Sequence, residues 1–482
     1  MRQGETKAAN ISHAFVDELA SMDAIATAEA VRTGQISAGE VTAGAIARAE
    51  AVDPRLRAIA TRDFERAGTA SMKGAAGPFA GVPTLIKDLI DVAGLATRQG
   101  SQALDHAAPA RHNAGIVQQM FDMGMICLGK TTLPEFGFTP SAEFPHDEPT
   151  RNPWNVDHTA GGSSGGAAAL VAAGVVPIAH AADGGGSTRI PAACCGLVGL
   201  KPTRSRLLPR PEARLMLVDV VTDGVLTRSV RDTALYFAEA EIRYRNPKLE
   251  PVGHVTSPLQ RRLRIGAVLD TPTGAAVDAP TRRTFETTVA LLESLGHRVD
   301  AMPLPVSERF GDDFIHYYGM LAFLVSVSGK LMFDRSFDKT KLTPLTHGLA
   351  AQFKRQIGKT PGAVRRLRRS AREYARLFET YDVVLSPVVG QLAPPVGHLG
   401  MGLPFDVLFP RVVEWAGYTP LANATGAPSI SLPLGHDAAT NLPIGMMFGA
   451  AHGKDALLLQ LALEIEAAQP WPSLADAGRT GG

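Results

Sequence analysis

Apolar residues recur at helical spacing in the first part of the chain. In residues 22–35 they lie three or four positions apart, and Gly34 marks the end of the predicted helix. A second helix is predicted to begin at Ser37, because Ser37 and Glu40 can satisfy each other's free backbone N–H groups in a capping box. We expect this helix to end at the pair Asp53-Pro54.

Farther along, the pattern alternates between strands and helices. Residues 262–302 predict a strand, an amphipathic helix and a second strand, which indicates a parallel pair covered by a helix. Residues 305–380 are mostly helical in pattern, and residues 382–385 predict a further strand. No internal repeat or linker interrupts the pattern. We therefore expect one α/β domain over residues 1–482, with a helical excursion.

A buried strand is predicted over residues 81–91, and it carries a lysine. Lys87 stands among apolar and β-branched residues, and lysine is rarely fully buried unless it is paired. An ion pair with Asp88 or Asp91 would make Lys87 a structural residue, although Asp88 points to the opposite face of a strand. The pattern alone leaves both the ion pair and a functional role open.

Residues 124–131, GMICLGKT, match the letters of a phosphate-binding loop. The four residues between the two glycines are apolar and predict a strand. A phosphate-binding loop instead needs backbone N–H groups that wrap around the anion. We therefore interpret this segment as a strand and not as a nucleotide site.

Composition narrows the class of protein. The chain of 482 residues is 45% hydrophobic and 20% charged, which is typical of a globular protein with a sizeable core. A formal net charge of +1 argues against a broad nucleic-acid interface. The arginines between Arg365 and Arg376 are accordingly interpreted as a solvated helix face and not as an RNA-binding face.

Cysteine usage and the apolar runs bear on location. Cys127, Cys194 and Cys195 are few, and their spacing fits neither a CxxC pair nor a metal cluster. The first ten residues lack the apolar segment of a secretory signal, and no run is long enough to cross a bilayer. We expect a cytoplasmic protein in a reducing compartment, without a metal.

Two segments rich in glycine and serine dominate the middle of the chain. The first Gly-Ser segment is residues 161–166, GGSSGG, and the second is residues 184–187, GGGS. Glycines this dense let backbone N–H groups approach a ligand closely. The first segment also fits the G-x-S-x-G elbow of α/β-hydrolases. That elbow must follow a strand, whereas residues 151–155 predict a turn, which weighs against this interpretation.

Taken together, these motifs resemble the amidase signature family of serine amidohydrolases. The resemblance rests on Lys87 in GVPTLIKD, on GGSSGG, on DGGGSTRIPA followed by CGLVGLKPT, and on NATGAPSISLPLG near the end of the chain. Ser163 and Ser187 lie 24 residues apart (163 to 187), the spacing usual in that family. The lead-in TRNPWN also resembles a bacterial branch that includes 6-aminohexanoate-cyclic-dimer hydrolase. The likeness spans nearly the whole chain and is thinnest over about 303–410.

This resemblance implies an amidase-signature fold, with a central mixed β-sheet flanked by helices on both faces. Within the single domain it implies amino-terminal helices over about 22–52, a signature core over about 73–235 and a variable, helical substrate region over about 303–410. It further implies an amidase that cleaves a carboxylic amide through an acyl-enzyme, without a cofactor.

The resemblance also implies a role for each catalytic residue. Ser187 matches the nucleophile, Ser163 the bridging serine after a cis peptide bond from Gly162, and Lys87 the general base. Lys87 must be neutral to accept a proton, and apolar neighbours would disfavour its charged form.

The remaining site residues follow from the same likeness. The backbone N–H groups of Gly184, Gly185, Gly186 and Ser187 are expected to form the oxyanion hole. Ser164, Asp183 and Arg189 match supporting positions. Gly184 departs from the family pattern, which commonly has a β-branched residue there, and this leaves more room beside the scissile bond or a more mobile loop.

Substrate contacts are predicted from the variable segments. The candidates are Glu135, Phe136, Phe138, Tyr318 and Trp415. Their aromatic character favours an apolar or aryl acyl group. We expect a small-molecule amide as partner, no nucleic acid or membrane, and a homodimer as the candidate assembly.

Two alternatives remain open at this point. One is a glutaminase or amide-transfer protein that resembles the amidase-type chain of glutaminyl-tRNA amidotransferase, but such chains usually carry Gln where Ile190 follows Arg189. The other is a binding protein that has kept the fold without the chemistry, which the intact Lys87, Ser163 and Ser187 argue against.

Overall fold

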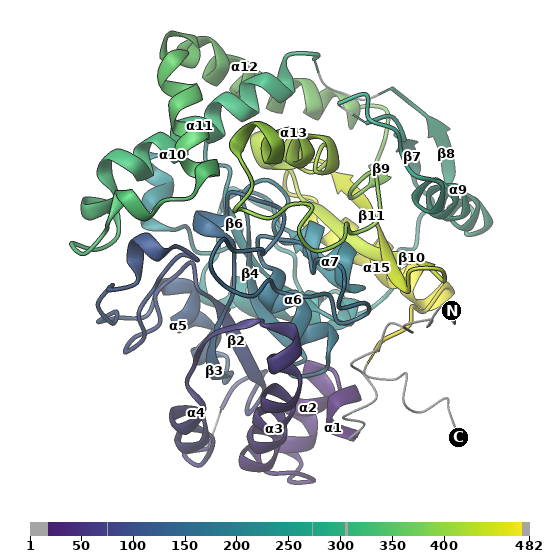
Figure 1. Ribbon diagram of the computed structural model, residues 1–482. Coiled ribbons are helices and arrows are strands. Elements are labelled where there is room, and N and C mark those ends of the chain that lie inside the picture. The colour runs from purple at the N-terminus through teal and green to yellow at the C-terminus, as the bar shows by residue number, and fades with distance from the viewer. Residues whose placement is uncertain (1–17, 75, 272, 304–306, 475–482) are drawn as a thin grey trace, which may run out of the picture.

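Two β-sheets form the framework of the chain (Figure 1). The computed structural model describes residues 18–474 except residues 75, 272 and 304–306. The large sheet has eight strands. In spatial order they are β4 (Ile178–Asp183), β6 (Thr222–Thr227), β5 (Val198–Lys201), β10 (Ser429–Asp437), β11 (Leu442–Ala450), β9 (Val383–Pro387), β7 (Arg264–Ala267) and β8 (Arg298–Ala301).

The large sheet is mixed. Strands β7, β8 and β9 pair in parallel, whereas β4, β6, β5, β10, β11 and β9 pair with their neighbours in antiparallel fashion. The strand-helix-strand unit predicted over 262–302 is confirmed as β7, the helix α9 (Ala279–Ser294) and β8.

The small sheet has three strands in the order β1 (Ile59–Arg62), β3 (Ile126–Thr131) and β2 (Pro83–Lys87). Strand β2 lies beside β4 of the large sheet, and the Thr84 hydroxyl donates to the carbonyl of Ile178 over 3.0 Å. The two sheets therefore meet at β2 and β4, and this junction carries the candidate site.

Helices cover both faces of the large sheet, as the resemblance implied. Helix α7 packs on β5, β10 and β11, while α8, α9 and α15 contact β6, β10 and β11. The bounds of the helices follow. They are α1 (Glu18–Ser21), α2 (Ala24–Arg32), α3 (Ala38–Leu56), α4 (Phe64–Ser71), α5 (Gly115–Asp122), α6 (Gly165–Ala172), α7 (Arg189–Cys195), α8 (Val230–Arg243), α9 (Ala279–Ser294), α10 (Phe310–Met332), α11 (Pro344–Arg355), α12 (Thr360–Leu377), α13 (Phe405–Trp415), α14 (Pro420–Thr425) and α15 (Asp455–Ala468).

The predicted helical excursion is formed by α10, α11 and α12, which pack on one another at one side of the molecule, green in Figure 1. On α12 the buried positions are apolar or small, and Arg365, Arg369 and Arg372 are exposed or only partly covered, as expected of a solvated helix face.

The second predicted helix begins as expected but ends later. Ser37 and Glu40 form the complete capping box of α3. The expected end at Asp53-Pro54 is wrong, because α3 continues to Leu56 with Pro54 inside it. The helix ends instead at Arg57, which adopts a left-handed conformation.

The predicted strand over 81–91 is confirmed only as β2, which ends at Lys87. Strand β3 extends beyond its predicted end and contains Gly129, Lys130 and Thr131. The segment that matches a phosphate-binding loop is therefore largely a β-strand, which excludes a loop wrapped around phosphate at this place.

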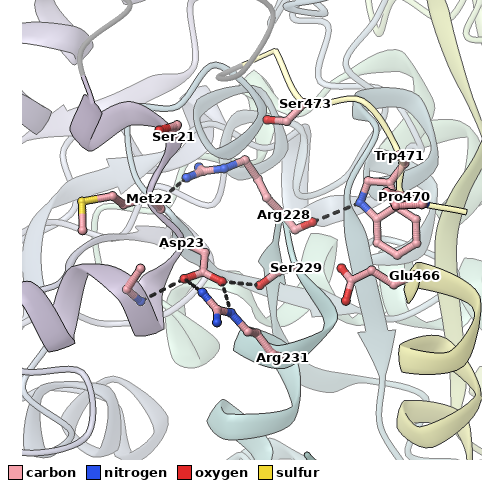
Figure 2. A pocket seen from close by; sticks show the side chains of 11 residues that line it. Ser21, Met22, Asp23, Arg228, Ser229, Arg231, Glu466, Pro470, Trp471 and Ser473 are labelled. Atoms are coloured by element: carbon pink, nitrogen blue, oxygen red, sulfur yellow. Dashed lines mark hydrogen bonds and ion pairs between the residues drawn. The ribbon is translucent and has the colours of Figure 1, made fainter. Parts of the chain in front are cut away.

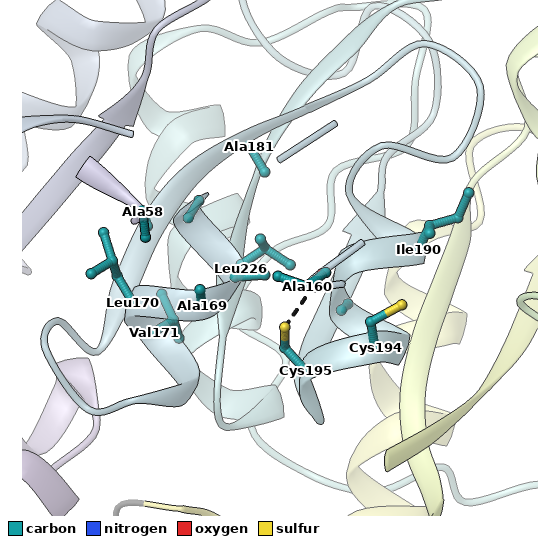
Figure 3. Packing of buried hydrophobic residues seen from close by; sticks show 14 of the residues in the cluster. Ala58, Ala160, Ala169, Leu170, Val171, Ala181, Ile190, Cys194, Cys195 and Leu226 are labelled. Carbon is teal, nitrogen blue, oxygen red and sulfur yellow. Dashed lines mark hydrogen bonds between the residues drawn. The ribbon is translucent and has the colours of Figure 1, made fainter. Parts of the chain in front are cut away.

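Helix α6 begins at Gly165, within the first Gly-Ser segment, and is buried on all sides. Its small residues permit close packing: a Cβ atom added to Gly166 would lie 2.5 Å from the carbonyl oxygen of Ala58. Figure 3 shows Leu170 of α6 beside Ala58, in the cluster that also holds Cys194 and Cys195. The helix start, which carries the serines, is thus held inside a packed core.

Residues 1–17 lie outside the described part of the chain. They include the first ten residues, on which the expected absence of a secretory signal was based. Among the described residues, no helix is long and apolar enough to cross a membrane. The prediction of a single domain stays a prediction.

Replacing Leu170 by alanine tests the packing of α6. We expect Leu170→Ala to lower the free energy of unfolding by about 2–5 kcal/mol, because it leaves a cavity in a core that cannot collapse around it. Urea unfolding measures the change. The matched control is Leu331→Ala on α10, where the leucine is 91% exposed and the effect should stay within about 0.5 kcal/mol. Equal effects at the two positions would contradict this packing.

Candidate active site

Lys87 lies at the carboxyl end of β2 and is completely buried. Its Nζ donates to Ser163 Oγ over 2.7 Å, to Ser164 Oγ over 2.9 Å and to the carbonyl oxygen of Ala182 over 3.3 Å. Its hydrogen bonds therefore lead to the first Gly-Ser segment and to β4.

The ion pair considered for Lys87 is absent. Asp88 pairs with Lys130, whose Nζ lies 2.5 Å from Asp88 Oδ1. Asp91 accepts a hydrogen bond from the Thr97 hydroxyl. Lys87 thus has no carboxylate partner among the described residues, and its role is not that of a strand-end ion pair.

Burial, reinforced by the positive charge of Arg210, lowers the pKa of Lys87 from 10.5 to about 7. The carboxylates of Asp183 and Asp223 act on this pKa in the opposite direction. A large fraction of the amines is then neutral near neutral pH. A neutral amine can accept a proton, which a surface lysine at this pH cannot do.

The first Gly-Ser segment presents two hydroxyl groups to Lys87. The peptide bond between Gly162 and Ser163 is cis, as the resemblance implied. Ser164 receives the second hydrogen bond from Lys87, and its backbone N–H donates to the carbonyl of Ser187 over 3.2 Å. This last bond ties the two Gly-Ser segments together.

Ser187 stands between β4 and α7, at the end of the second Gly-Ser segment. Its side chain is 7% exposed, and within residues 18–474, as far as they are described, its hydroxyl makes no hydrogen bond. The hydroxyl is thus free to approach a bound carbonyl group.

Asp183 organises the backbone around Ser187. Its carboxylate accepts from the backbone N–H groups of Gly186 and Thr188 over 2.7 and 3.1 Å. The Arg189 guanidinium donates to both carboxylate oxygens over 2.9 Å. Burial alone would raise the pKa of Asp183, but Arg189 holds it well below its usual range, so Asp183 stays ionised.

Two residues without a predicted role complete this arrangement. Asn423 on α14 donates to Asp183 and accepts from Arg189, and the Thr419 hydroxyl donates to the carbonyl of Gly185 over 2.6 Å. Asn423 stands in the motif NATGAP and could have been suspected from that match. No local signal identifies Thr419.

A further group of ionisable side chains, formed by His180, Asp223 and Arg210, acts on Lys87 through its charges. His180 on β4 pairs with Asp223 over 3.1 Å, and Arg210 donates to both oxygens of Asp223. His180 and Ala182 point to the same face of β4, because they lie two positions apart on a strand. This group was not predicted, and it is the source of the Arg210 charge that acts on Lys87.

Two of the predicted substrate contacts have other roles. Glu135 is buried, and its carboxylate accepts from Ser101, from Thr346 and from both the backbone and the hydroxyl of Thr343. It therefore caps the start of α11, and both of its oxygens are engaged within the protein. Trp415 is buried in the core, and its indole N–H donates to two backbone carbonyls.

The other three predicted contacts form a row of rings. Phe136 and Phe138 lie 6.1 Å apart, and Phe138 meets Tyr318 edge to face at 5.9 Å. A Cβ atom added to Gly137, between the two phenylalanines, would lie 2.9 Å from Ser163 Oγ. The backbone between the first two rings therefore lies directly beside Ser163.

A separate hollow lies between α2, the start of α8 and the carboxyl-terminal segment (Figure 2). Figure 2 shows Asp23 bound to Ser229 and Arg231 there. None of its lining residues belongs to the predicted site. Among the described residues, no group of three or more His, Cys, Asp or Glu side chains is placed to hold a metal ion.

The site thus combines a buried lysine with two serines in a glycine-rich surrounding. Comparison with known proteins shows that the chain is an amide-hydrolysing enzyme. The model of the family described as Amidase matches residues 40–459. The chain belongs to the amidase family.

Relatives with similar sequences carry amidase names. A protein named amidase AmiC in Mycobacterium tuberculosis (strain ATCC 25618 / H37Rv) is 49% identical over 95% of this chain and 97% of its own length. A 6-aminohexanoate-cyclic-dimer hydrolase from Pseudomonas sp. (strain NK87) is 34% identical over 93% of this chain and 95% of its own length.

Solved structures agree with this placement. The structure of a 6-aminohexanoate cyclic dimer hydrolase complexed with substrate superposes with a TM-score of 0.84 at 31% identity, over 94% of this chain and 98% of that chain. A bacterial aryl acylamidase of the amidase signature family gives 0.82 at 25% identity, over 96% and 99% of the two chains. The predicted family and fold are confirmed.

Replacing Arg189 by lysine tests how the Asp183–Arg189 pair supports the second Gly-Ser segment. Lysine cannot reproduce the forked contact with Asp183, so we expect Arg189→Lys to lower the free energy of unfolding by about 3 kcal/mol and to reduce activity. The matched control, Arg372→Lys on the outer face of α12, should leave both unchanged. A wild-type melting curve for Arg189→Lys would contradict the assigned role.

Proposed function

We propose that this amidase cleaves a carboxylic amide to an acid and an amine or ammonia through an acyl-enzyme on Ser187. The single observation that carries the proposal is the 2.7 Å hydrogen bond between the buried Lys87 amine and the Ser163 hydroxyl. It joins an amine with a pKa of about 7 to a hydroxyl of the first Gly-Ser segment, which the bond from the Ser164 N–H to the Ser187 carbonyl ties to Ser187.

The proton moves in a relay. Neutral Lys87 accepts the proton of Ser163 while Ser163 takes the proton of Ser187, whose oxygen attacks the amide carbonyl. The same route returns the proton to the leaving nitrogen, because an unprotonated amine leaves poorly. Water then attacks the acyl-enzyme, with the proton passing along Ser163 to Lys87 again.

Fewer N–H groups are available for an oxyanion hole than the four expected from the sequence. The N–H of Gly186 donates to Asp183, so it is not available to the substrate. In the described part of the chain, nothing accepts from the N–H groups of Gly184, Gly185 and Ser187. We propose these three as the donors, each worth about 3–4 kcal/mol of transition-state stabilisation.

The aromatic row bears on which acyl group of a substrate the site would accept. Phe136, Phe138 and Tyr318 stand between Ser163 and the second Gly-Ser segment, which favours an apolar or aryl acyl group. The names of the two structural neighbours, a cyclic dimer hydrolase and an aryl acylamidase, agree with amides of this character. The steps require no cofactor.

The amide-transfer alternative is not favoured. Relatives that cover almost the whole chain are named as amidases or as a hydrolase, and a chain of the glutamyl-tRNA(Gln) amidotransferase from Thermotoga maritima, at 24% identity, shares the fold alone. The homodimer and the cytoplasmic location stay predictions.

The nucleophile is tested by Ser187→Ala. We expect loss of kcat by about 10⁴-fold or more on a small aryl amide, because no other group can form the acyl-enzyme. Lys87→Met should be nearly as damaging. Ser294→Ala, an exposed serine at the end of α9, is the matched control with unchanged turnover. Full activity of Ser187→Ala would overturn the mechanism.

The base is tested by the pH dependence of kcat/KM. Because only the neutral Lys87 amine accepts a proton, kcat/KM should rise with pH through about 7 and level off above it. Lys201, another buried lysine, also has a pKa of about 7. The variant Arg210→Met separates the two, because the positive charge it removes lowers the pKa of Lys87: the rise should move to higher pH. An unmoved rise, or a flat profile between pH 6 and 8, would contradict Lys87 as the base.

A further inference from the structure

The hydroxyl of Tyr318 on α10 lies against the second Gly-Ser segment. A Cβ atom added to Gly185 would lie 3.1 Å from this oxygen, and one added to Gly184 would lie 3.3 Å from it. Gly184 and Gly185 carry two of the three N–H groups proposed for the oxyanion hole. A side chain from the helical excursion thus reaches the edge of the reaction centre.

Neighbouring rings hold Tyr318 in this position. Phe314, one turn earlier on α10, stacks on it at 5.2 Å, and Phe138 meets it edge to face at 5.9 Å. Such contacts fix the ring plane, so its hydroxyl has little freedom to turn elsewhere.

The Tyr318 hydroxyl has no hydrogen-bond partner within the described residues, in contrast to its neighbour. Tyr317 donates to the carbonyl of Val218 over 2.7 Å and accepts from its N–H over 2.9 Å. A half-buried hydroxyl left unpaired loses free energy unless a water molecule or a ligand binds it. Burial and the charge of Asp183 raise the pKa of Tyr318 well above 10, so the group stays a donor.

Gly184 supplies the room for this hydroxyl. Its φ is not in the left-handed region, so the backbone does not require glycine there. A side chain would instead crowd Tyr318 Oη and, at 3.4 Å, a methyl group of Val221. The departure from the β-branched residue common in the family is therefore explained by space for Tyr318, and the loop is not left open.

We propose that Tyr318 is a specificity-determining residue whose hydroxyl donates a hydrogen bond to the substrate at the Gly184–Gly185 edge of the site. This rests on the proposed function. The substrate class is an amide with an apolar or aryl acyl group, packed on the ring row, and with an acceptor oxygen at or next to the scissile carbonyl.

The first test is Tyr318→Phe, which keeps the ring and removes the donor. We expect kcat/KM on an aryl amide to fall about 10- to 100-fold with an unchanged melting temperature, because the lost contact is with the substrate and not with the protein. Tyr381→Phe, beside Arg264 on the far part of the sheet, is the matched control with wild-type kinetics. Wild-type kcat/KM for Tyr318→Phe would overturn the inference.

The second test is a double-mutant cycle with Gly184→Ala. Alone, the added methyl group should displace the Tyr318 hydroxyl and lower kcat/KM about tenfold, whereas in the Tyr318→Phe background it should cost at least threefold less. Additive effects would contradict the coupling. Failure of the inference is distinguishable from failure of the proposed function, because the latter would show as full activity of Ser187→Ala.

Discussion

The burial of one amine constrains the rest of the site. Lys87 Nζ lies where the small sheet meets the large one. Within the described part of the chain, its hydrogen bonds lead only to two serine hydroxyls and a backbone carbonyl. Burial without a carboxylate partner disfavours the ammonium form, which turns a lysine into a base near neutral pH. The contact between β2 and β4 therefore sets the environment of this amine.

The two Gly-Ser segments lie around this amine, and each is held in place by contacts with other parts of the chain. The first Gly-Ser segment is fixed by α6, whose small buried residues allow close packing, and the second by the Asp183–Arg189 pair with Asn423. The bond from Ser164 N–H to the Ser187 carbonyl joins them. The N–H of Gly186 is bound to Asp183 in this support and is therefore not available to a ligand.

Local patterns predicted what depends on short stretches of chain. The capping box at Ser37 and the strand-helix-strand unit over 262–302 could be taken from the sequence. The family resemblance, and not a local pattern, pointed to Lys87, Ser163 and Ser187, and the first two of these are hydrogen-bonded to each other. Pairings between residues that are distant in the sequence could not be predicted in this way. Glu135 was expected at the substrate, but the start of α11, some two hundred residues later, takes its carboxylate. Thr419 reaches Gly185 from equally far away and carries no local signal.

The most direct measurement of the central claim is labelling of the enzyme with a fluorophosphonate followed by tandem mass spectrometry. Ser163, Ser164 and Ser187 fall in one tryptic peptide, residues 152–189, so fragment ions must assign the position. We predict that the label lies on Ser187, that its rate of attachment rises with pH through about 7, and that it is absent from Ser187→Ala. A label on Ser163 or Ser164 in the wild-type enzyme would contradict it.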